Sequence, residues 1–158
     1  LHTKAGVERL DKAAAARGFT LVALARNPID AAWKDQPARP LSPARPHGLE
    51  LAGRSSGDKR RQVADAVAKA GADAVLLTAP PSIAWLFNIR GADVSRTPLP
   101  LGRALVTKEG KATLFLAPEK VGNELPAFLG DDVDIRAEAD VEAGLEKLGR
   151  EKQRVAVD

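Results

Sequence analysis

Residues 72–91 read ADAVLLTAPPSIAWLFNIRG and hold two apolar runs separated by a proline pair. The first run, residues 74–78, is short and continuous, which is typical of a strand buried on both faces of a sheet. Pro80 and Pro81 end it, because proline has no amide hydrogen to donate to a neighbouring strand. The second run, residues 83–89, predicts another strand, with Trp85 mostly buried in the core.

The segments on either side of this stretch add helices and further strands. Ser55 and Asp58 have the spacing of a capping box at the start of a helix that Gly71 ends. Residues 103–107 and 112–116 flank a turn that contains glycine, which predicts a β-hairpin. Further predicted elements are a short helix near 118–122, strands at 133–135 and 154–157, and a helix with its apolar face at 141–148. We therefore predict an α/β fold, a mixed sheet of about five or six strands with helices on its faces.

The first 48 residues differ in character from the rest. Residues 3–17 predict a helix capped by Thr3, and residues 19–24 predict a short buried strand. Five prolines then fall between residues 27 and 46, which disfavours both helices and internal strands. We predict that residues 1–26 are the tail of a preceding α/β domain and that residues 27–48 form a Pro-rich linker. Residues 49–158 are then expected to fold as one small domain.

Composition narrows the class of protein. The 158 residues are 44% hydrophobic and 28% charged, which is typical of globular proteins. No apolar run is long enough for a membrane span, and the absence of cysteine excludes disulfides and fits a reducing compartment such as the cytoplasm. The net charge of +3 comes from scattered basic and acidic residues without any tyrosine, so we expect no nucleic-acid partner. Because the chain starts at Leu1 and lacks methionine, we expect it to be a fragment.

The usual catalytic patterns are missing from the sequence. His2 and His47 have no second ligand at helical spacing, so neither is expected to bind a metal. The acidic group at residues 131–134 lacks the pattern of a calcium loop. Ser55 and Ser56 precede a helix and are better explained as caps than as nucleophiles. We therefore predict no catalytic residue, no cofactor and no metal site in this chain.

Asn88 and Arg90 are the candidate site residues. They follow the apolar run at 83–87, and ligand sites often lie where strands end. We consider them candidates for a substrate cleft. The structural alternative is that Asn88 completes a turn and that Arg90 pairs with Asp93.

Three blocks of sequence resemble one enzyme family. Residues 82–101, SIAWLFNIRGADVSRTPLPL, are similar to a stretch of the cytosolic, three-domain Xaa-Pro aminopeptidases (aminopeptidase P). Residues 51–56, with Lys59, resemble the entry to the second domain of that family. Trp33, Asp35 and Arg39–Pro40 resemble the linker before it. One departure is Pro81, which stands where the family usually has an acidic residue.

The resemblance implies both a fold and an activity. It implies a creatinase-type amino-terminal domain for residues 49–158, within a metallopeptidase that removes an N-terminal residue preceding proline. In that family the catalytic domain comes later, has a pita-bread fold and holds two divalent metal ions, usually manganese. This chain would then be a non-catalytic accessory portion, inactive alone, in a cytoplasmic protein that is a homodimer when full length. Its partners would be the catalytic domain of the same polypeptide and a peptide with proline second. The alternative is a free-standing interaction module of the same fold without peptidase activity.

Overall fold

The computed structural model describes residues 2–158, which form two compact units divided between Ala38 and Arg39. The first unit contains α1 (Lys4–Ala15) and α2 (Pro28–Ala32). Thr3 caps α1 as predicted, since its hydroxyl accepts a hydrogen bond from the Gly6 amide at 3.1 Å. The strand predicted at residues 19–24 is wrong, because these residues are exposed and have no regular structure. A strand needs a hydrogen-bonded neighbour, and the described part of this unit contains only helices and irregular segments.

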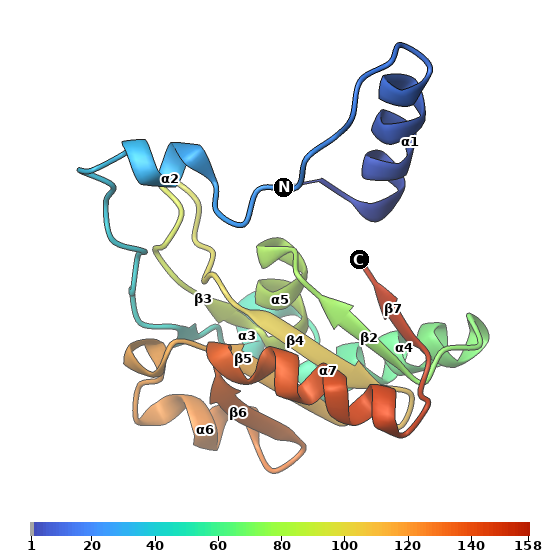
Figure 1. Ribbon diagram of the computed structural model, residues 1–158. Helices are drawn as coiled ribbons and strands as arrows, with labels where there is room; N and C mark the ends of the chain where they lie inside the picture. The colour runs from blue at the N-terminus through green and yellow to red at the C-terminus, as the bar shows by residue number, and fades with distance from the viewer. Residues whose placement is uncertain (1) are drawn as a thin grey trace. The chain divides into compact units, whose positions relative to one another are not determined.

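The second unit is built on a mixed five-stranded sheet with the order β6-β5-β4-β2-β7 (Figure 1). Its strands are β2 (Ala74–Leu77), β4 (Arg103–Thr107), β5 (Ala112–Leu116), β6 (Val133–Ala137) and β7 (Val155–Val157). The strands β2, β4 and β5 are antiparallel in succession, whereas β6 runs parallel to β5 and β7 parallel to β2. The predicted hairpin is confirmed, with Gly110 at φ 86° in its turn. The predicted fold class is confirmed as well.

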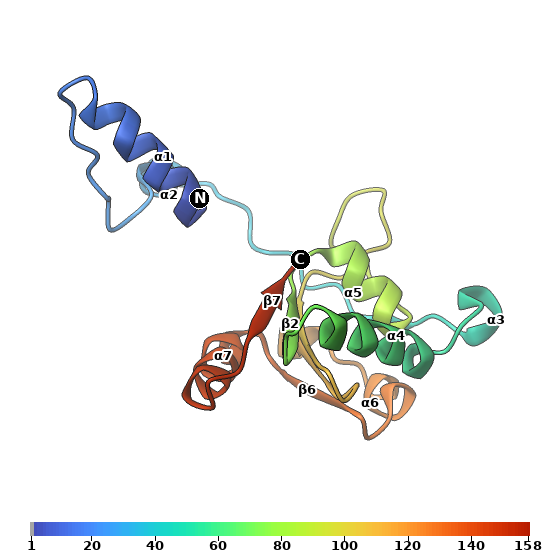
Figure 2. The ribbon, with the colours of Figure 1, turned by 90° about the vertical axis from the view of Figure 1, so that its right-hand side faces the viewer.

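Helices cover both faces of this sheet (Figure 2). The side chains of each strand alternate between the two faces. Leu77, Ala104 and Leu114 pack on the side of α4 (Ser56–Lys69), α5 (Pro80–Phe87) and α6 (Glu124–Leu129). Leu76, Leu105 and Phe115 pack on the opposite side, beneath α7 (Val141–Arg150). Because both faces are covered, β2 reads as an unbroken apolar run in the sequence.

Residues 83–87 lie within the helix α5, so the strand predicted there is wrong. Pro80 and Pro81 occupy its first turn. Backbone amides have no partner within the helix at this position, so the missing amide hydrogen of proline costs nothing, and the fixed φ of proline suits a helix. The inner side of α5 is fully buried, but Trp85 is 44% exposed, so its predicted burial is also wrong. A short apolar run of this kind does not by itself distinguish a strand from a buried helix.

A second, two-stranded sheet pairs β1 (Arg45–Pro46) with β3 (Ile89–Arg90). Residues 39–48 therefore belong to the second unit, although the sequence predicts them to be part of a linker. Ala44 is buried in the core, and its amide donates to the Lys120 carbonyl at 2.9 Å. The remaining elements are α3 (Leu49–Ala52) and two 3₁₀ turns, η1 (Pro118–Lys120) and η2 (Glu138–Asp140). Within residues 2–158, none of the helices combines the length and the apolar character that crossing a membrane requires.

Candidate functional site

Asn88 ends α5 and turns the chain into β3. Its backbone is left-handed, with φ 51° and ψ 51°, and asparagine tolerates this conformation better than most residues. The residue is only 3% exposed, and its carbonyl accepts a hydrogen bond from the His47 amide at 2.8 Å. Asn88 thus completes a turn, as the structural alternative predicts, and directs the next residues toward β1.

Lys59, on α4, lies beneath this turn. Its ammonium donates to Asn88 Oδ1 at 2.5 Å and to the Trp85 carbonyl at 3.0 Å, and it lies 4.9 Å from the centroid of the Trp85 ring. The Asn88 amide nitrogen donates in turn to the Arg54 carbonyl at 2.8 Å. Burial lowers the pKa of Lys59, and repulsion from Arg90 and Arg54 lowers it further. This cation is therefore held by neutral oxygens and an aromatic ring instead of a carboxylate.

Spacing within α4 could have identified Lys59 as an inward-facing residue. Lys59, Val63 and Val67 are four residues apart, which places all three on one face of a helix. A lysine on the apolar face of an amphipathic helix must find acceptors inside the protein. The acceptors themselves are not visible in the sequence, because they come from the end of a different helix.

Arg90 is half-buried and lies opposite Arg45 in the register of β1 and β3. Its Nη1 donates to the Ile89 carbonyl at 2.9 Å and to the Ala84 carbonyl at 3.3 Å. The two arginines line a pocket of about 280 Å³, together with Ser42, Pro43, Gly91 and Ala92. Two guanidinium groups at one pocket favour negatively charged or carbonyl-bearing ligands.

Asp93 is paired with Lys120, so the predicted alternative in which it pairs with Arg90 is wrong. The ion pair is buried, with side-chain exposures of 0% for Asp93 and 2% for Lys120, and its N–O distance is 2.6 Å. Asp93 also accepts the amides of Ser42 at 3.0 Å and Leu101 at 2.7 Å. Burial raises the pKa of Asp93, but the bonds from Lys120 and from Leu101 outweigh burial and hold it below its usual range.

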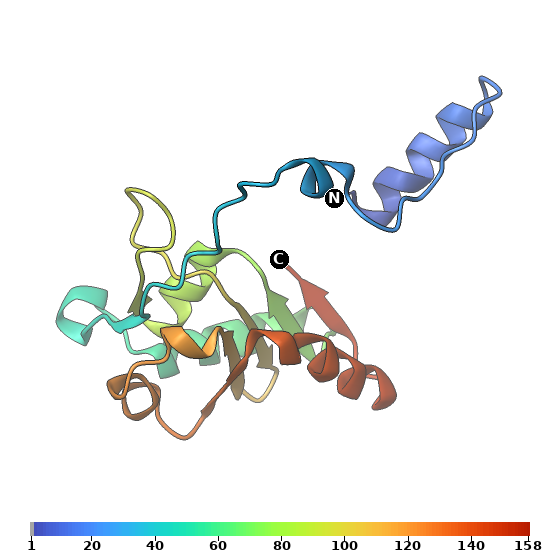
Figure 3. The same ribbon diagram turned by 60° about the vertical axis from the view of Figure 1, so that its left-hand side comes forward.

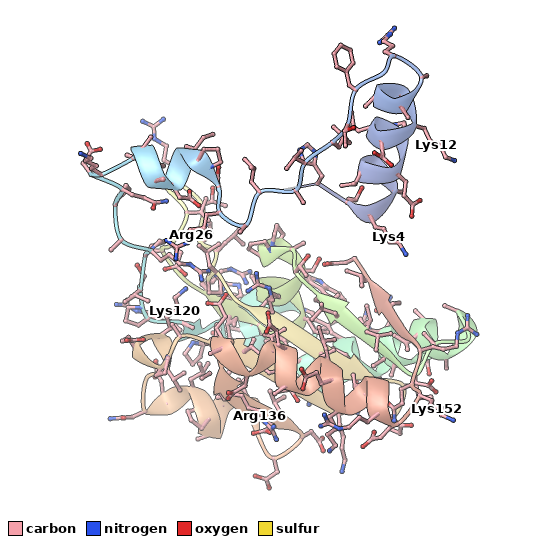
Figure 4. All side chains as sticks on the ribbon, viewed as in Figure 1. Lys4, Lys12, Arg26, Lys120, Arg136 and Lys152 are labelled. Atoms are coloured by element: carbon pink, nitrogen blue, oxygen red, sulfur yellow. The ribbon has the colours of Figure 1, made fainter. Side chains whose placement is uncertain are left out.

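This buried pair fixes the rim of the arginine pocket. Lys120 belongs to η1, Asp93 to the loop after β3, and Ser42 to the segment before β1. The Lys120 side chain is buried, whereas that of Arg136 is exposed; Figure 4 labels both residues. The segment before β1 and the loop after β3, which form the two sides of the pocket, are therefore both held by the buried Asp93–Lys120 ion pair.

The other candidate groups of the sequence do not gather at this pocket. Ser55 Oγ accepts the Asp58 amide at 3.0 Å, which confirms the predicted cap. His2 is exposed, and His47 is engaged through its backbone amide. Within residues 2–158, no group of three or more His, Cys, Asp or Glu side chains is placed to share a metal ion.

Comparisons with known proteins agree with the resemblance in the sequence. The family model described as "Creatinase/Prolidase N-terminal domain" matches residues 35–158. The "Probable Xaa-Pro aminopeptidase P" of Neosartorya fischeri is 30% identical over 99% of this chain, which covers 24% of that relative. "Aminopeptidase P1" of Arabidopsis thaliana is 32% identical over 84% of this chain, or 21% of its own length. The chain thus spans about a quarter of the length of such curated relatives.

A solved structure shows the same fold. It is the X-prolyl aminopeptidase of Caenorhabditis elegans, described as a cytosolic enzyme with a di-nuclear active site. The two structures match with a TM-score of 0.83 and 23% identity, over 99% of this chain and 26% of the nematode chain. At this identity the match shows the shared architecture alone.

Proposed function

The chain belongs to the creatinase/prolidase N-terminal domain family, and from this premise we propose that it is the accessory portion of an Xaa-Pro aminopeptidase. The parent protein would remove an N-terminal residue when proline follows it. One observation carries the proposal: proteins named Xaa-Pro aminopeptidase P match nearly the whole chain while being about four times as long.

We assign the bond-breaking chemistry to polypeptide outside residues 2–158. These residues do not fit a metal site, because they bring no suitable set of ligands together. Two divalent ions, with manganese as the expected metal, would belong to a catalytic domain elsewhere in the same polypeptide. The accessory portion would shape access to the cleft, which changes substrate binding without contributing to bond cleavage itself.

Arg90 is the residue that we propose to contact the peptide. Its Nη1 is held by two backbone carbonyls, and Arg90 lines a pocket that Arg45 also lines. An arginine stays protonated, so it would bind a peptide carbonyl or carboxylate and would not act as a base. Asn88 lies two positions before Arg90, and its side-chain amide is already engaged by Lys59 and Arg54, so we assign it to support of Arg90.

The full-length protein provides the test. We expect it to release the first residue of Xaa-Pro-Xaa peptides in the presence of manganese and to leave Xaa-Ala-Xaa peptides intact. Arg90→Ala should lower kcat/KM with little change in melting temperature. Arg61→Ala is the matched control, because Arg61 is an exposed arginine on α4 outside the pocket.

Two results would contradict these assignments. Peptidase activity that copurifies with residues 1–158 alone would refute the accessory role. An unchanged kcat/KM with a lowered melting temperature would limit Arg90 to a structural role. We also propose that the parent protein is cytoplasmic and that it is a homodimer. Light scattering at several protein concentrations can check the dimer.

A further inference from the structure

The outer side of α5 lines an apolar groove. Pro81, Ser82, Trp85 and Leu86 of α5, with Val63 of α4 and Leu77 of β2, enclose about 420 Å³. None of these six side chains is charged, and Trp85 is 44% exposed. We call this feature the α5 groove. An exposed aromatic side chain within a contiguous apolar groove is typical of an interaction surface. A single exposed aromatic residue among polar neighbours would carry no such indication.

Trp85 is held in place from inside the protein. The Lys59 ammonium lies 4.9 Å from the centroid of its ring and also binds its carbonyl at 3.0 Å. A side chain already fixed in this way loses little conformational freedom when a partner covers it. The α5 groove is thus organised before anything binds.

The last residue of the chain is held next to this groove. Asp158 Oδ1 accepts the Thr78 amide at 2.8 Å and the Thr78 hydroxyl at 2.9 Å, and Oδ2 accepts the Ala79 amide at 3.2 Å. Ala79 is the N-cap of α5, and Leu77 lines the groove itself. Figure 3 shows the end of β7 beside the segment that joins β2 to α5. Any residues after Asp158 therefore begin close to the groove.

We propose that the α5 groove is the docking surface for the polypeptide that follows Asp158, which packs apolar side chains against Trp85 and Pro81. The inference rests on the proposed function, in which a catalytic domain follows. Relatives that match 99% of this chain extend to about four times its length, so their additional polypeptide is ample to cover the groove. The uncharged lining matches the interior of a domain contact, whereas a nucleic acid would need basic residues and a charged peptide would need residues of the opposite charge.

Oxidative footprinting of the full-length protein tests the proposal. Hydroxyl radicals label accessible tryptophans, and mass spectrometry reads the extent of labelling at each one. Trp33 is 47% exposed here, close to the value for Trp85, so the two residues can be compared within one sample. We expect Trp85 to be labelled severalfold more slowly in the native protein than in the denatured protein. We expect no comparable protection at Trp33.

A paired substitution makes the test specific. Ser82→Arg places a long cation in the α5 groove and should restore labelling of Trp85 and promote proteolysis just after Asp158. Ser95→Arg, at an exposed loop position, is the control and should change neither reading. Rapid labelling of Trp85 in the native full-length protein would overturn the proposal. Protection that disappears on dilution would also overturn it, because a second copy would then be the occupant.

These readings do not depend on catalysis, so they separate the docking surface from the proposed function. Protected Trp85 in a protein that does not cleave proline peptides would support the docking surface and refute the proposed function. Exposed Trp85 in an active peptidase would do the reverse.

Discussion

At the scale of single residues, two buried lysines of the second unit are bound in different ways. Lys120 pairs with the carboxylate of Asp93, whereas Lys59 is surrounded by neutral acceptors. A buried ion pair contributes little net stability, because desolvation offsets attraction, but losing one partner leaves a bare charge inside the protein. Both lysines therefore constrain the chain near the arginine pocket.

Replacing Asp93 by Asn should destabilise the fold by about 3–5 kcal/mol, because Lys120 would keep its buried charge without a counter-ion. The matched control is Asp134→Asn, since the Asp134–Arg136 pair is exposed and should be worth at most about 1 kcal/mol. Urea unfolding at neutral pH measures both changes. Equal effects of the two substitutions would contradict the assigned role of Asp93.

The same pair should make stability depend on acidity. The pKa of Asp93 is lower in the folded than in the unfolded protein, so its contribution is complete above the unfolded value of about 3.9. This contribution to the unfolding free energy is lost as the pH falls through the lower pKa that Asp93 has in the folded protein. The difference in unfolding free energy between the parent protein and Asp93→Asn should therefore be constant near neutrality and shrink below about pH 4.

At the scale of elements, α5 is the part of the fold that the sequence predicts least well. Its apolar run fits a buried strand as well as a buried helix, and the choice depends on the space between α4 and the sheet. The hairpin, the flanking helices and the capping of α4 follow from local chemistry and were predictable. The sequence singles out Asn88 and Arg90 as candidates, and their role at a substrate cleft stays a prediction. Tertiary pairing alone brings Arg45 to Arg90 and Lys59 to Asn88, so sequence reasoning missed Arg45 and the anchoring role of Lys59.

Two substitutions of Asn88 separate its backbone role from its side-chain role. Asn88→Gly keeps the left-handed turn but removes the acceptor for Lys59, which should cost about 1–3 kcal/mol. Asn88→Ala loses the same bond and adds backbone strain, so it should cost about 1–2 kcal/mol more. Thermal unfolding of the two variants gives the difference. An alanine variant as stable as the glycine variant would show that the strain is relieved elsewhere.

At the scale of the whole molecule, the boundary between the two units can be tested by truncation. Truncation at the predicted boundary near Gly48 would remove β1, Ala44 and the Ser42 amide that donates a hydrogen bond to Asp93. A polypeptide of residues 39–158 should unfold cooperatively, as small domains do. A polypeptide of residues 49–158 should have a lower melting temperature or a broad transition. Equal melting temperatures would show that residues 39–48 are dispensable.

The pairing of β7 with β2 has a consequence for synthesis on the ribosome. The two strands are neighbours in the sheet but far apart in the sequence. Thr78, which follows β2, is hydrogen-bonded to Asp158, which follows β7 and lies 80 positions later. At about 5–20 residues per second, β2 emerges roughly 4–16 s before the strand that will cover its edge. During that interval the nascent chain presents the unpaired backbone edge of the apolar strand β2 to its surroundings. The residues around β2 are therefore the place where we expect chaperones to engage this protein before its translation is finished.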